Sequence, residues 1–183
     1  MGRLQSKSFI AKSGDHILVR SALPTDADQI LELARSVIDE EIYQLTSSAE
    51  FKMTAADEEK WILSHQENPN HLLLVAVLND RIVGMLDFSN GRRQRIAHTG
   101  EFGMSVAKDC RENGIGSCLI GTLIEWARST KAIEKINLSV HSNNERAIAL
   151  YKKMGFEVEG VRKRDLKYSN GNYIDTVIMG RTL

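Results

Sequence analysis

The segment Arg111-Glu112-Asn113-Gly114-Ile115-Gly116-Ser117 decides how the chain around it is expected to fold. An apolar run, residues 102–106, precedes it, and an amphipathic stretch that ends near Ser129 follows it. This order predicts a strand, a glycine-containing turn and a helix. Free backbone N–H groups and the positive end of the helix dipole then surround one point. Both features favour an anion, so the turn is a candidate phosphate site.

The same turn also has an ordinary structural interpretation. Two glycines two positions apart permit a tight turn with close helix–sheet packing. No Lys-Ser/Thr pair follows Gly116, which argues against a P-loop, and Leu119 stands where a dinucleotide fingerprint has its third glycine. The flanking elements therefore have to decide between the two interpretations.

Length and composition restrict the class of protein. The chain has 183 residues, enough for one domain with a full core, and its 24 basic and 24 acidic residues do not indicate a nucleic-acid or membrane partner. Cys110 and Cys118 have no metal-ligand spacing around them, and residues 1–9 lack the apolar core of a secretory signal. We expect a cytoplasmic protein without a metal, made of a polar, loosely held segment 1–15 and one domain 16–183.

Apolar periodicity and helix-start signals place the helices. Thr25 and Asp28 have the spacing of a capping box, as do Thr54 with Asp57 and Ser142 with Glu145. The second helix is expected to end at residues 68–70, the helix after the glycine turn near Ser129, and the last one at Met154, with Gly155 as its C-cap.

Period-two alternation and turn residues place the strands. Residues 79–80 and 89–91 are predicted turns, and residues 92–95 form a basic loop. Together these signals predict an α/β (α+β) protein with a single mixed, mostly antiparallel sheet of about six to seven strands and helices on both faces. The expected strands are residues 17–20, 71–78, 81–88, 96–106, 135–140, 156–161 and 173–179.

Residues 106–156 resemble the core of the GCN5-related N-acetyltransferase (GNAT) superfamily. The pattern of that family is an apolar strand, Arg/Gln-x-x-Gly-x-Gly/Ala, a helix, a strand and Asn-x-x-Ala-x-x-Leu-Tyr-x-x-x-Gly-Phe. Residues 111–116 match its first motif, residues 144–156 match its second, and the element order of residues 17–183 is similar throughout. Residues 100–106 and the tail 159–175 are similar to the branch that holds spermidine and ribosomal-protein N-acetyltransferases.

The resemblance implies an acetyl-CoA-dependent N-acetyltransferase, often a homodimer, that acetylates a primary amine in a ternary complex. The acceptor would be a small molecule, such as a polyamine or an amino acid, or a protein N-terminus. The pantetheine arm would pair with the strand before the glycine turn, which requires the central parallel strand pair to splay. The implied acetyl-CoA-binding residues are Met104, Ser105, Val106, Arg111, Glu112, Asn113, Gly114, Ile115, Gly116, Ser117, Asn144, Ala147 and Tyr151.

Tyr151 and Glu101 are the candidate catalytic residues. The resemblance puts Tyr151 near the thioester sulfur, where it could protonate the leaving thiolate, and the alternative is simple ring packing. Glu101 could take the proton of the attacking amine, directly or through a water, or it could form a structural salt bridge. His98 and His141 are weaker candidates for the base. The family often has an acidic residue where this chain has Ser139.

Several assignments stay open from the sequence. Asn144 could bind the pantetheine arm or cap a helix, and Arg111 could bind a phosphate or pair with Glu112 or Asp109. Both cysteines are interpreted as structural rather than as acetyl carriers. A CoA-binding sensor without turnover and a mononucleotide-binding protein are the alternative functions.

The acceptor is open as well. The acidic runs 39–41 and 57–59 could attract a cationic amine, or they could be solvated helix faces. Arg92, Arg93 and Arg95 could instead bind a carboxylate, as an amino-acid substrate would require. These indications oppose each other, so the sequence does not identify the substrate.

Overall fold

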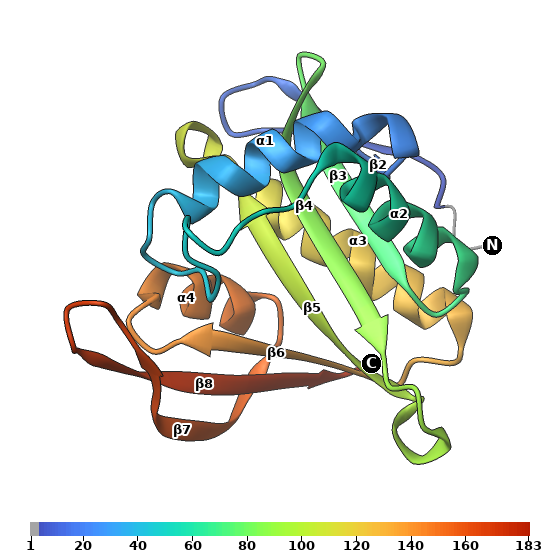
Figure 1. The fold of residues 1–183 in the computed structure, drawn as a ribbon. Coiled ribbons are helices and arrows are strands. Elements are labelled where there is room, and N and C mark those ends of the chain that lie inside the picture. The colour runs from blue at the N-terminus through green and yellow to red at the C-terminus, as the bar shows by residue number, and fades with distance from the viewer. Residues whose placement is uncertain (1–3) are drawn as a thin grey trace.

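The computed structural model describes residues 4–183 and contains one eight-stranded sheet in the order β1-β2-β3-β4-β5-β6-β8-β7 (Figure 1). Every neighbouring pair is antiparallel except β5–β6. The expected mixed, mostly antiparallel sheet is therefore confirmed. The strands are β1 (Lys7–Ile10), β2 (His16–Ser21), β3 (Leu72–Leu78), β4 (Arg81–Asn90), β5 (Thr99–Val106), β6 (Lys135–His141), β7 (Glu157–Lys167) and β8 (Tyr173–Thr182).

Helices cover both faces of this sheet, as expected (Figure 1). On β4, the side chain of Phe88 packs edge-on against Trp126 of α3, with ring centroids 5.6 Å apart. Because side chains alternate along a strand, the neighbouring Asp87 lies on the other face, the one covered by α1 and α2. The helices are α1 (Ala27–Ile38), α2 (Ala55–Glu67), α3 (Ile115–Thr130) and α4 (Glu145–Lys153).

Strand β1 is the main departure from the expected element order. Residues 7–10 were predicted to be loosely held, but they pair antiparallel with β2. The polar side chains of Lys7 and Ser8 are acceptable there because β1 is an edge strand. Residues 1–3 of the predicted N-terminal segment lie outside the described residues. The two last strands are also longer than predicted, since β7 reaches Lys167 and β8 reaches Thr182.

One predicted capping box is present and two are not. Thr54 accepts from the backbone N–H of Asp57, whose carboxylate accepts in return from the N–H of Thr54. The box at Thr25 and Asp28 was wrong, because Asp26 accepts from the N–H of Leu23 at 2.7 Å instead.

The box at Ser142 and Glu145 was also wrong. Asn144 caps α4, and its Oδ1 accepts from the N–H of Ala147 at 3.2 Å. Of the two sequence-based roles for Asn144, helix capping is therefore present.

The parallel pair β5–β6 opens after only three residue pairs. Pairing runs from Thr99–Lys135 to Glu101–Asn137, and from Phe102 onward that edge of β5 has no strand partner. Three aromatic rings, those of Phe102, Tyr151 and Phe156, occupy the space where the strands separate. Their centroids lie 5.7 to 6.1 Å apart, a range typical of edge-on packing. The expected splay is confirmed, and these rings, the aromatic wedge, fill it.

We expect Phe102→Ala to lower the free energy of unfolding by about 3 kcal/mol, because it removes a buried ring and leaves a cavity in the wedge. Urea denaturation would measure the change. Val161→Ala on exposed β7 serves as the control and should cost less than about 0.5 kcal/mol. A loss for Phe102→Ala as small as that of the control would mean that the wedge does not support the splay.

Candidate active site

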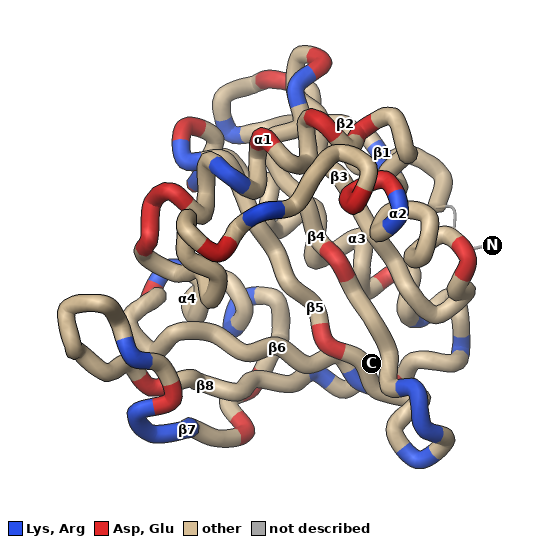
Figure 2. The backbone as a smooth tube through the Cα atoms, viewed as in Figure 1, with Lys and Arg blue, Asp and Glu red and all other residues tan. Residues whose placement is uncertain are grey.

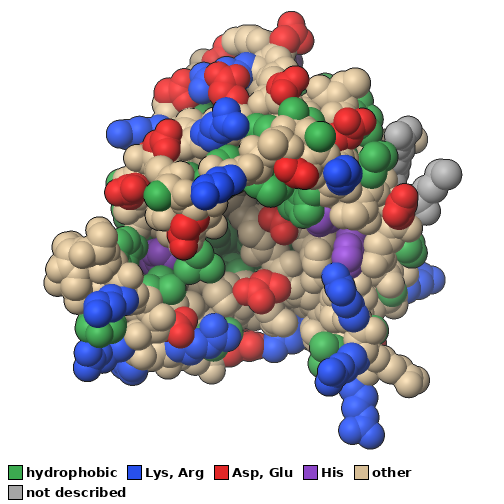
Figure 3. Space-filling model, viewed as in Figure 1, with side chains coloured by type: hydrophobic (Ala, Val, Ile, Leu, Met, Phe, Trp, Pro, Cys, Tyr) green, Lys and Arg blue, Asp and Glu red, His purple; other side chains and the backbone are tan. Residues whose placement is uncertain are grey.

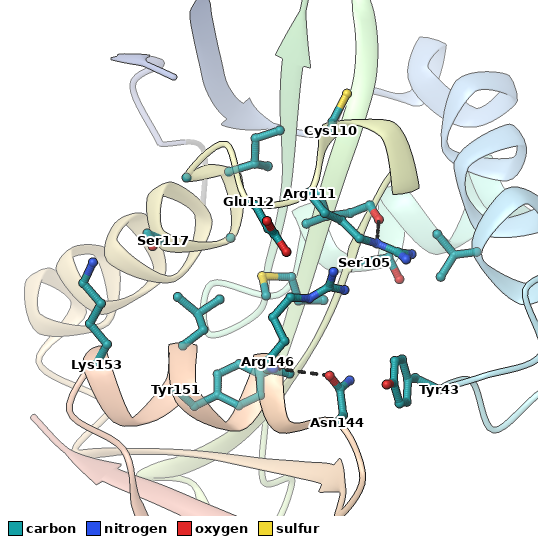
Figure 4. A pocket seen from close by; sticks show the side chains of 18 of the residues that line it. Tyr43, Ser105, Cys110, Arg111, Glu112, Ser117, Asn144, Arg146, Tyr151 and Lys153 are labelled. Atoms are coloured by element: carbon teal, nitrogen blue, oxygen red, sulfur yellow. Dashed lines mark hydrogen bonds between the residues drawn. The ribbon is translucent and has the colours of Figure 1, made fainter. Parts of the chain in front are cut away.

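A cavity of about 300 Å³ lies between the unpaired edge of β5 and α4, next to the turn that joins β5 to α3 (Figure 4). All the residues expected to bind the co-substrate line it except Asn113, whose carbonyl accepts from the backbone N–H of Lys12. Glu101 does not line it either. The lining residues that the sequence did not indicate are Lys12, Val37, Tyr43, Gln44, Cys110, Arg146, Leu150 and Lys153.

The two glycines of the turn have different physical roles. Gly114 caps α3 with a φ of 91°, a left-handed conformation that side chains disfavour. Gly116 has no such φ, but a Cβ there would lie 2.9 Å from Leu150 Cδ2 and 3.3 Å from Met104 Cε. Gly116 therefore lets the first turn of α3 approach β5 and α4, while Gly114 directs the chain into the helix.

The guanidinium group of Arg111 is bound by other groups of the protein. Its Nε donates to the carbonyl of Val106 at 3.1 Å, and its guanidinium makes a two-pronged ion pair with Glu40, with Nη1 and Oε2 2.8 Å apart. Arg111 holds the pKa of the Glu40 carboxyl below its usual value. The expected pairing with Glu112 or Asp109 is not what the structure has, since Asp109 pairs with Arg81 at 2.7 Å.

Tyr151 reaches the cavity from α4 (Figure 4). Its side chain is 8 % exposed and belongs to the aromatic wedge. Burial raises the pKa of its phenol to about 12, so the hydroxyl is protonated throughout the neutral range. Tyr151 therefore packs as the structural interpretation requires, and it also presents a protonated donor to the cavity.

Three exposed cations surround the cavity, and the sequence reasoning missed them. Arg146 and Lys153 come from α4, and Lys12 comes from the turn between β1 and β2. None of the three makes an ion pair within residues 4–183. Arg146 lies within the second motif, next to the expected Ala147, and this neighbour could have indicated its position. Lys12 could not have been found, because the turn between β1 and β2 was not predicted.

On the α2 side of β5, three carboxyl groups lie near one another, from Glu58 on α2, Asp87 on β4 and Glu101 on β5. The backbone positions of acidic residues on β4 and β5 are marked in Figure 2. Asp87 lies over β5, since its Oδ1 is 2.8 Å from the point that a Cβ of Gly103 would occupy. Burial and the charge of Asp87 raise the pKa of Glu58 to about 7. Burial, with a contribution from Glu101, raises the pKa of Asp87. We call this group the carboxyl cluster.

The weaker base candidates have other surroundings. His98 is an exposed residue whose carbonyl binds the chain at Glu134. His141 is buried, which lowers its pKa, and its Nδ1 lies 3.0 Å from the hydroxyl of Tyr168. That hydroxyl donates to the carbonyl of Ile42 at 2.5 Å, so β7–β8 is tied to the segment after α1. His141 is part of this chain of hydrogen bonds.

The acidic runs 39–41 and 57–59 each contain residues with different surroundings. Glu40 pairs with Arg111, Asp57 caps α2, and Glu58 is buried, so neither run is simply a solvated face. Burial raises the pKa of the Cys110 and Cys118 thiols, which fits their structural interpretation. Within residues 4–183 there is no cluster of His, Cys, Asp and Glu that could hold a metal, and none of the helices described is long and apolar enough to cross a bilayer.

Comparisons with known proteins agree with this geometry. The Acetyltransferase (GNAT) family matches residues 39–156. The L-amino acid N-acetyltransferase AaaT of Escherichia coli (strain K12) is 35% identical over 117 residues, 63% of this chain and 70% of that protein. A GNAT-family acetyltransferase from Streptococcus pneumoniae superposes with a TM-score of 0.87 at 29% identity, over 91% of this chain and 99% of that one.

A putative acetyltransferase from Salmonella typhimurium, solved with acetyl-CoA, has the same fold, with a TM-score of 0.82 at 20% identity over 91% of this chain and 94% of that one. A mixed sheet that opens at its parallel pair, with a cavity at the opening, defines an acetyltransferase of the GNAT fold. This chain belongs to the GNAT family. The matches do not establish the spermidine and ribosomal-protein branch, which stays a prediction.

We expect Glu58→Gln to stabilise the protein above pH 7 by about 2 kcal/mol. Folding raises the pKa of Glu58 to about 7. Glu58 therefore contributes fully to stability at pH values below its pKa in the unfolded chain, and this contribution is lost as the pH rises to about 7. Asp87, Glu101 and His65 face the same region in both proteins.

Urea denaturation from pH 4 to 8.5 measures this difference. Wild type and Glu58→Gln should converge at low pH and separate between pH 4.5 and 7. Glu59→Gln, an exposed neighbour on the same helix, should follow wild type throughout. Curves for Glu58→Gln and wild type that stay parallel over the whole range would contradict the assignment.

Proposed function

We propose that this protein transfers the acetyl group of acetyl-CoA to a primary amine by direct attack within a ternary complex. The observation that carries the proposal is the unpaired edge of β5 from Phe102 to Val106, part of which lines a cavity together with the glycine turn and Tyr151. A pantetheine arm has peptide-like amides that can pair with such an edge. The fold and the family support the same activity.

The residues present fit the donor substrate. The backbone N–H groups at the start of α3, after Gly114, suit a pyrophosphate. Arg111 contributes its backbone to this site, because its guanidinium is occupied by Glu40. The exposed cations Lys12, Arg146 and Lys153 supply the positive charge that the phosphates require.

Some backbone groups on the unpaired edge of β5 are not available to the pantetheine arm. The Val106 carbonyl already accepts from Arg111, so the arm has to use other backbone groups of β5. Asn144 uses its Oδ1 to cap α4, which leaves its amide Nδ2 able to donate to the arm. Capping and binding by Asn144 are thus compatible.

In the reaction, the amine nitrogen bonds to the thioester carbonyl carbon, and the C–S bond breaks with its electron pair leaving on sulfur. A backbone N–H on the edge of β5 polarises the carbonyl oxygen. Glu101 receives the proton of the amine, directly or through a water, from the opposite face of the same strand.

Tyr151 stabilises the thiolate by hydrogen bonding. A thiol has a pKa of about 8.5, well below that of the buried phenol, so full proton transfer is uphill unless burial also raises the pKa of the thiol. A hydrogen bond to the departing sulfur needs no complete transfer. This sharpens the general-acid role expected from the sequence.

We place the protein in the cytoplasm. Cys110 and Cys118 are free thiols, and the chain has no other cysteine. Proteins of oxidising compartments more often pair their cysteines.

Thiol release from acetyl-CoA, followed with a chromogenic disulfide over a panel of amines, tests the function. We expect release with at least one of a monoamine, a diamine, an amino acid or a peptide N-terminus. Binding of acetyl-CoA with no release for any acceptor would favour a CoA-binding sensor. Binding of ATP without binding of acetyl-CoA would overturn the assignment.

Tyr151→Phe should lower kcat about 10²-fold or more and leave the Kd for acetyl-CoA nearly unchanged, because it removes the donor and keeps the ring of the wedge. Stopped-flow turnover and calorimetric titration would measure the two quantities. Unchanged kcat would exclude a role for the hydroxyl in the reaction. A weaker Kd with unchanged kcat would make Tyr151 a positioning residue.

A further inference from the structure

The carboxyl cluster lies beside the reacting edge of β5. Because side chains alternate along a strand, Glu101, Gly103 and Ser105 share one face of β5. The Asp87 carboxyl lies over Gly103, so it sits between Glu101 and Ser105. Ser105 belongs to the lining of the donor cavity. A molecule that reaches the thioester from the α2 side therefore passes Asp87 and Glu101.

Glu58 extends this cluster toward α2. It is 4 % exposed, and its carboxyl makes no ion pair or side-chain hydrogen bond within residues 4–183. Asp87 and Glu101 likewise lack an ion pair there. Buried carboxyl groups are ordinarily paired, so the buried Glu58 next to the half-buried Asp87, with no cation to offset either, is exceptional. Glu101 lies beside them and is exposed. Glu40, unlike these three residues, has its charge neutralised by Arg111.

Buried polar atoms without a partner point to a ligand independently of the carboxyl groups. Within residues 4–183 these atoms are His65 Nε2, His71 Nε2 and Asn137 Oδ1. His65 is 6 % exposed, and its Nδ1 contacts the carbonyl of Trp61 on its own helix, so its Nε2 is directed away from α2. It is close enough to Asp87 for its charge to affect that carboxyl. Asn137 lies opposite Glu101 in the last β5–β6 pair.

These buried atoms lie around the carboxyl cluster. The rings of His65 and His71 are 5.4 Å apart, so His71 closes the β3 side, while Asn137 stands on the β6 side. Figure 3 shows this face hollowed, with acidic side chains along the depression. Carboxylates, a carbonyl oxygen and imidazole nitrogens can all accept hydrogen bonds from an ammonium group.

We propose that the acceptor carries a second cationic group beside the amine that is acetylated, and that Glu58 and Asp87 bind this second group while Glu101 faces the reacting amine. This inference rests on the proposed function and names its substrate class, a diamine-like acceptor. Two positive charges offset the charge of the cluster, whereas one ammonium group leaves most of it uncompensated.

An α-amino acid fits this face less well. Its carboxylate would enter a hollow that already holds three carboxyl groups, and like charges there destabilise binding. The cations able to offset it are on the basic loop 92–95, whose arginines are exposed beyond the end of β4 (Figure 2). Arg92 is the member of that loop near His71. The zwitterionic acceptor is therefore the competing outcome of the test.

Steady-state kinetics with 1,4-diaminobutane, butylamine and L-leucine distinguish these acceptors, because the first two differ only in the second amine. We expect wild type to have a kcat/KM for the diamine at least about 10-fold above that for butylamine. Asp87→Asn and Glu58→Gln should each lower the diamine value about 10-fold, mainly through KM, and change the butylamine value less than about 3-fold. Both replacements keep the shape of the side chain.

Glu125→Gln is the matched control, since it removes an exposed carboxylate of α3 that pairs with Lys7. It should leave all three substrates unchanged. Thermal melting at pH 8 shows whether each variant is folded, and Glu58→Gln is expected to melt no lower than wild type because it removes an unpaired buried acid. If one carboxyl variant does not fold, the other still decides the outcome.

Equal kcat/KM for diamine and butylamine would overturn the inference. So would a preference for leucine that Arg92→Gln abolishes and Asp87→Asn leaves intact, which would identify a zwitterionic acceptor. Both of these results leave the proposed N-acetyltransferase function standing. Absence of thiol release with every amine would instead overturn the proposed function itself.

Discussion

The separation of β5 from β6 after Glu101 is the constraint on which the rest of the site depends. Two parallel strands that begin paired would ordinarily continue, because each unpaired backbone group is costly to bury. Here the rings of Phe102, Tyr151 and Phe156 pack against one another in the opening, and the cavity lies beside them. The free edge of β5 can then bind a substrate. Tyr151, which helps to hold the strands apart, also faces the cavity that the opening creates.

A single strand connects the two halves of the site. One face of β5 presents Met104 to the donor cavity, and the other presents Glu101 and the glycine that accommodates Asp87. The two halves differ in whether their charged side chains are paired. Beside the glycine turn, Arg111 and Glu40 neutralise each other, and the cations that stay unpaired among the described residues there, Lys12, Arg146 and Lys153, are exposed. On the opposite face the carboxyl groups of Glu58 and Asp87 are left without a cation, a state that a positively charged ligand would relieve.

Elements with a strong local signal could be predicted, and those that depend on distant contacts could not. The Thr54–Asp57 box, the Asn79-Asp80 turn and the left-handed Gly114 follow from preferences of a few adjacent residues. The caps at Asp26 and Asn144 were misassigned because several polar residues in each segment can cap. The direction from which the chain enters the helix selects among them. Strand β1 was missed because its pairing with β2, not its own pattern, makes it a strand.

The sequence by itself determined the order of the main elements from β2 onward, the glycine turn and the helix that carries Tyr151, because 3.6-residue and two-residue periodicities and turn chemistry act over short distances. The residues that the family resemblance implied for the co-substrate line the cavity, except Asn113. Only the tertiary structure decided that Arg111 is occupied by Glu40, that Lys12 reaches the cavity, and that Glu58 and Asp87 join Glu101. Those contacts join residues that are far apart in the chain. Their charges interact strongly only after packing has removed the water between them.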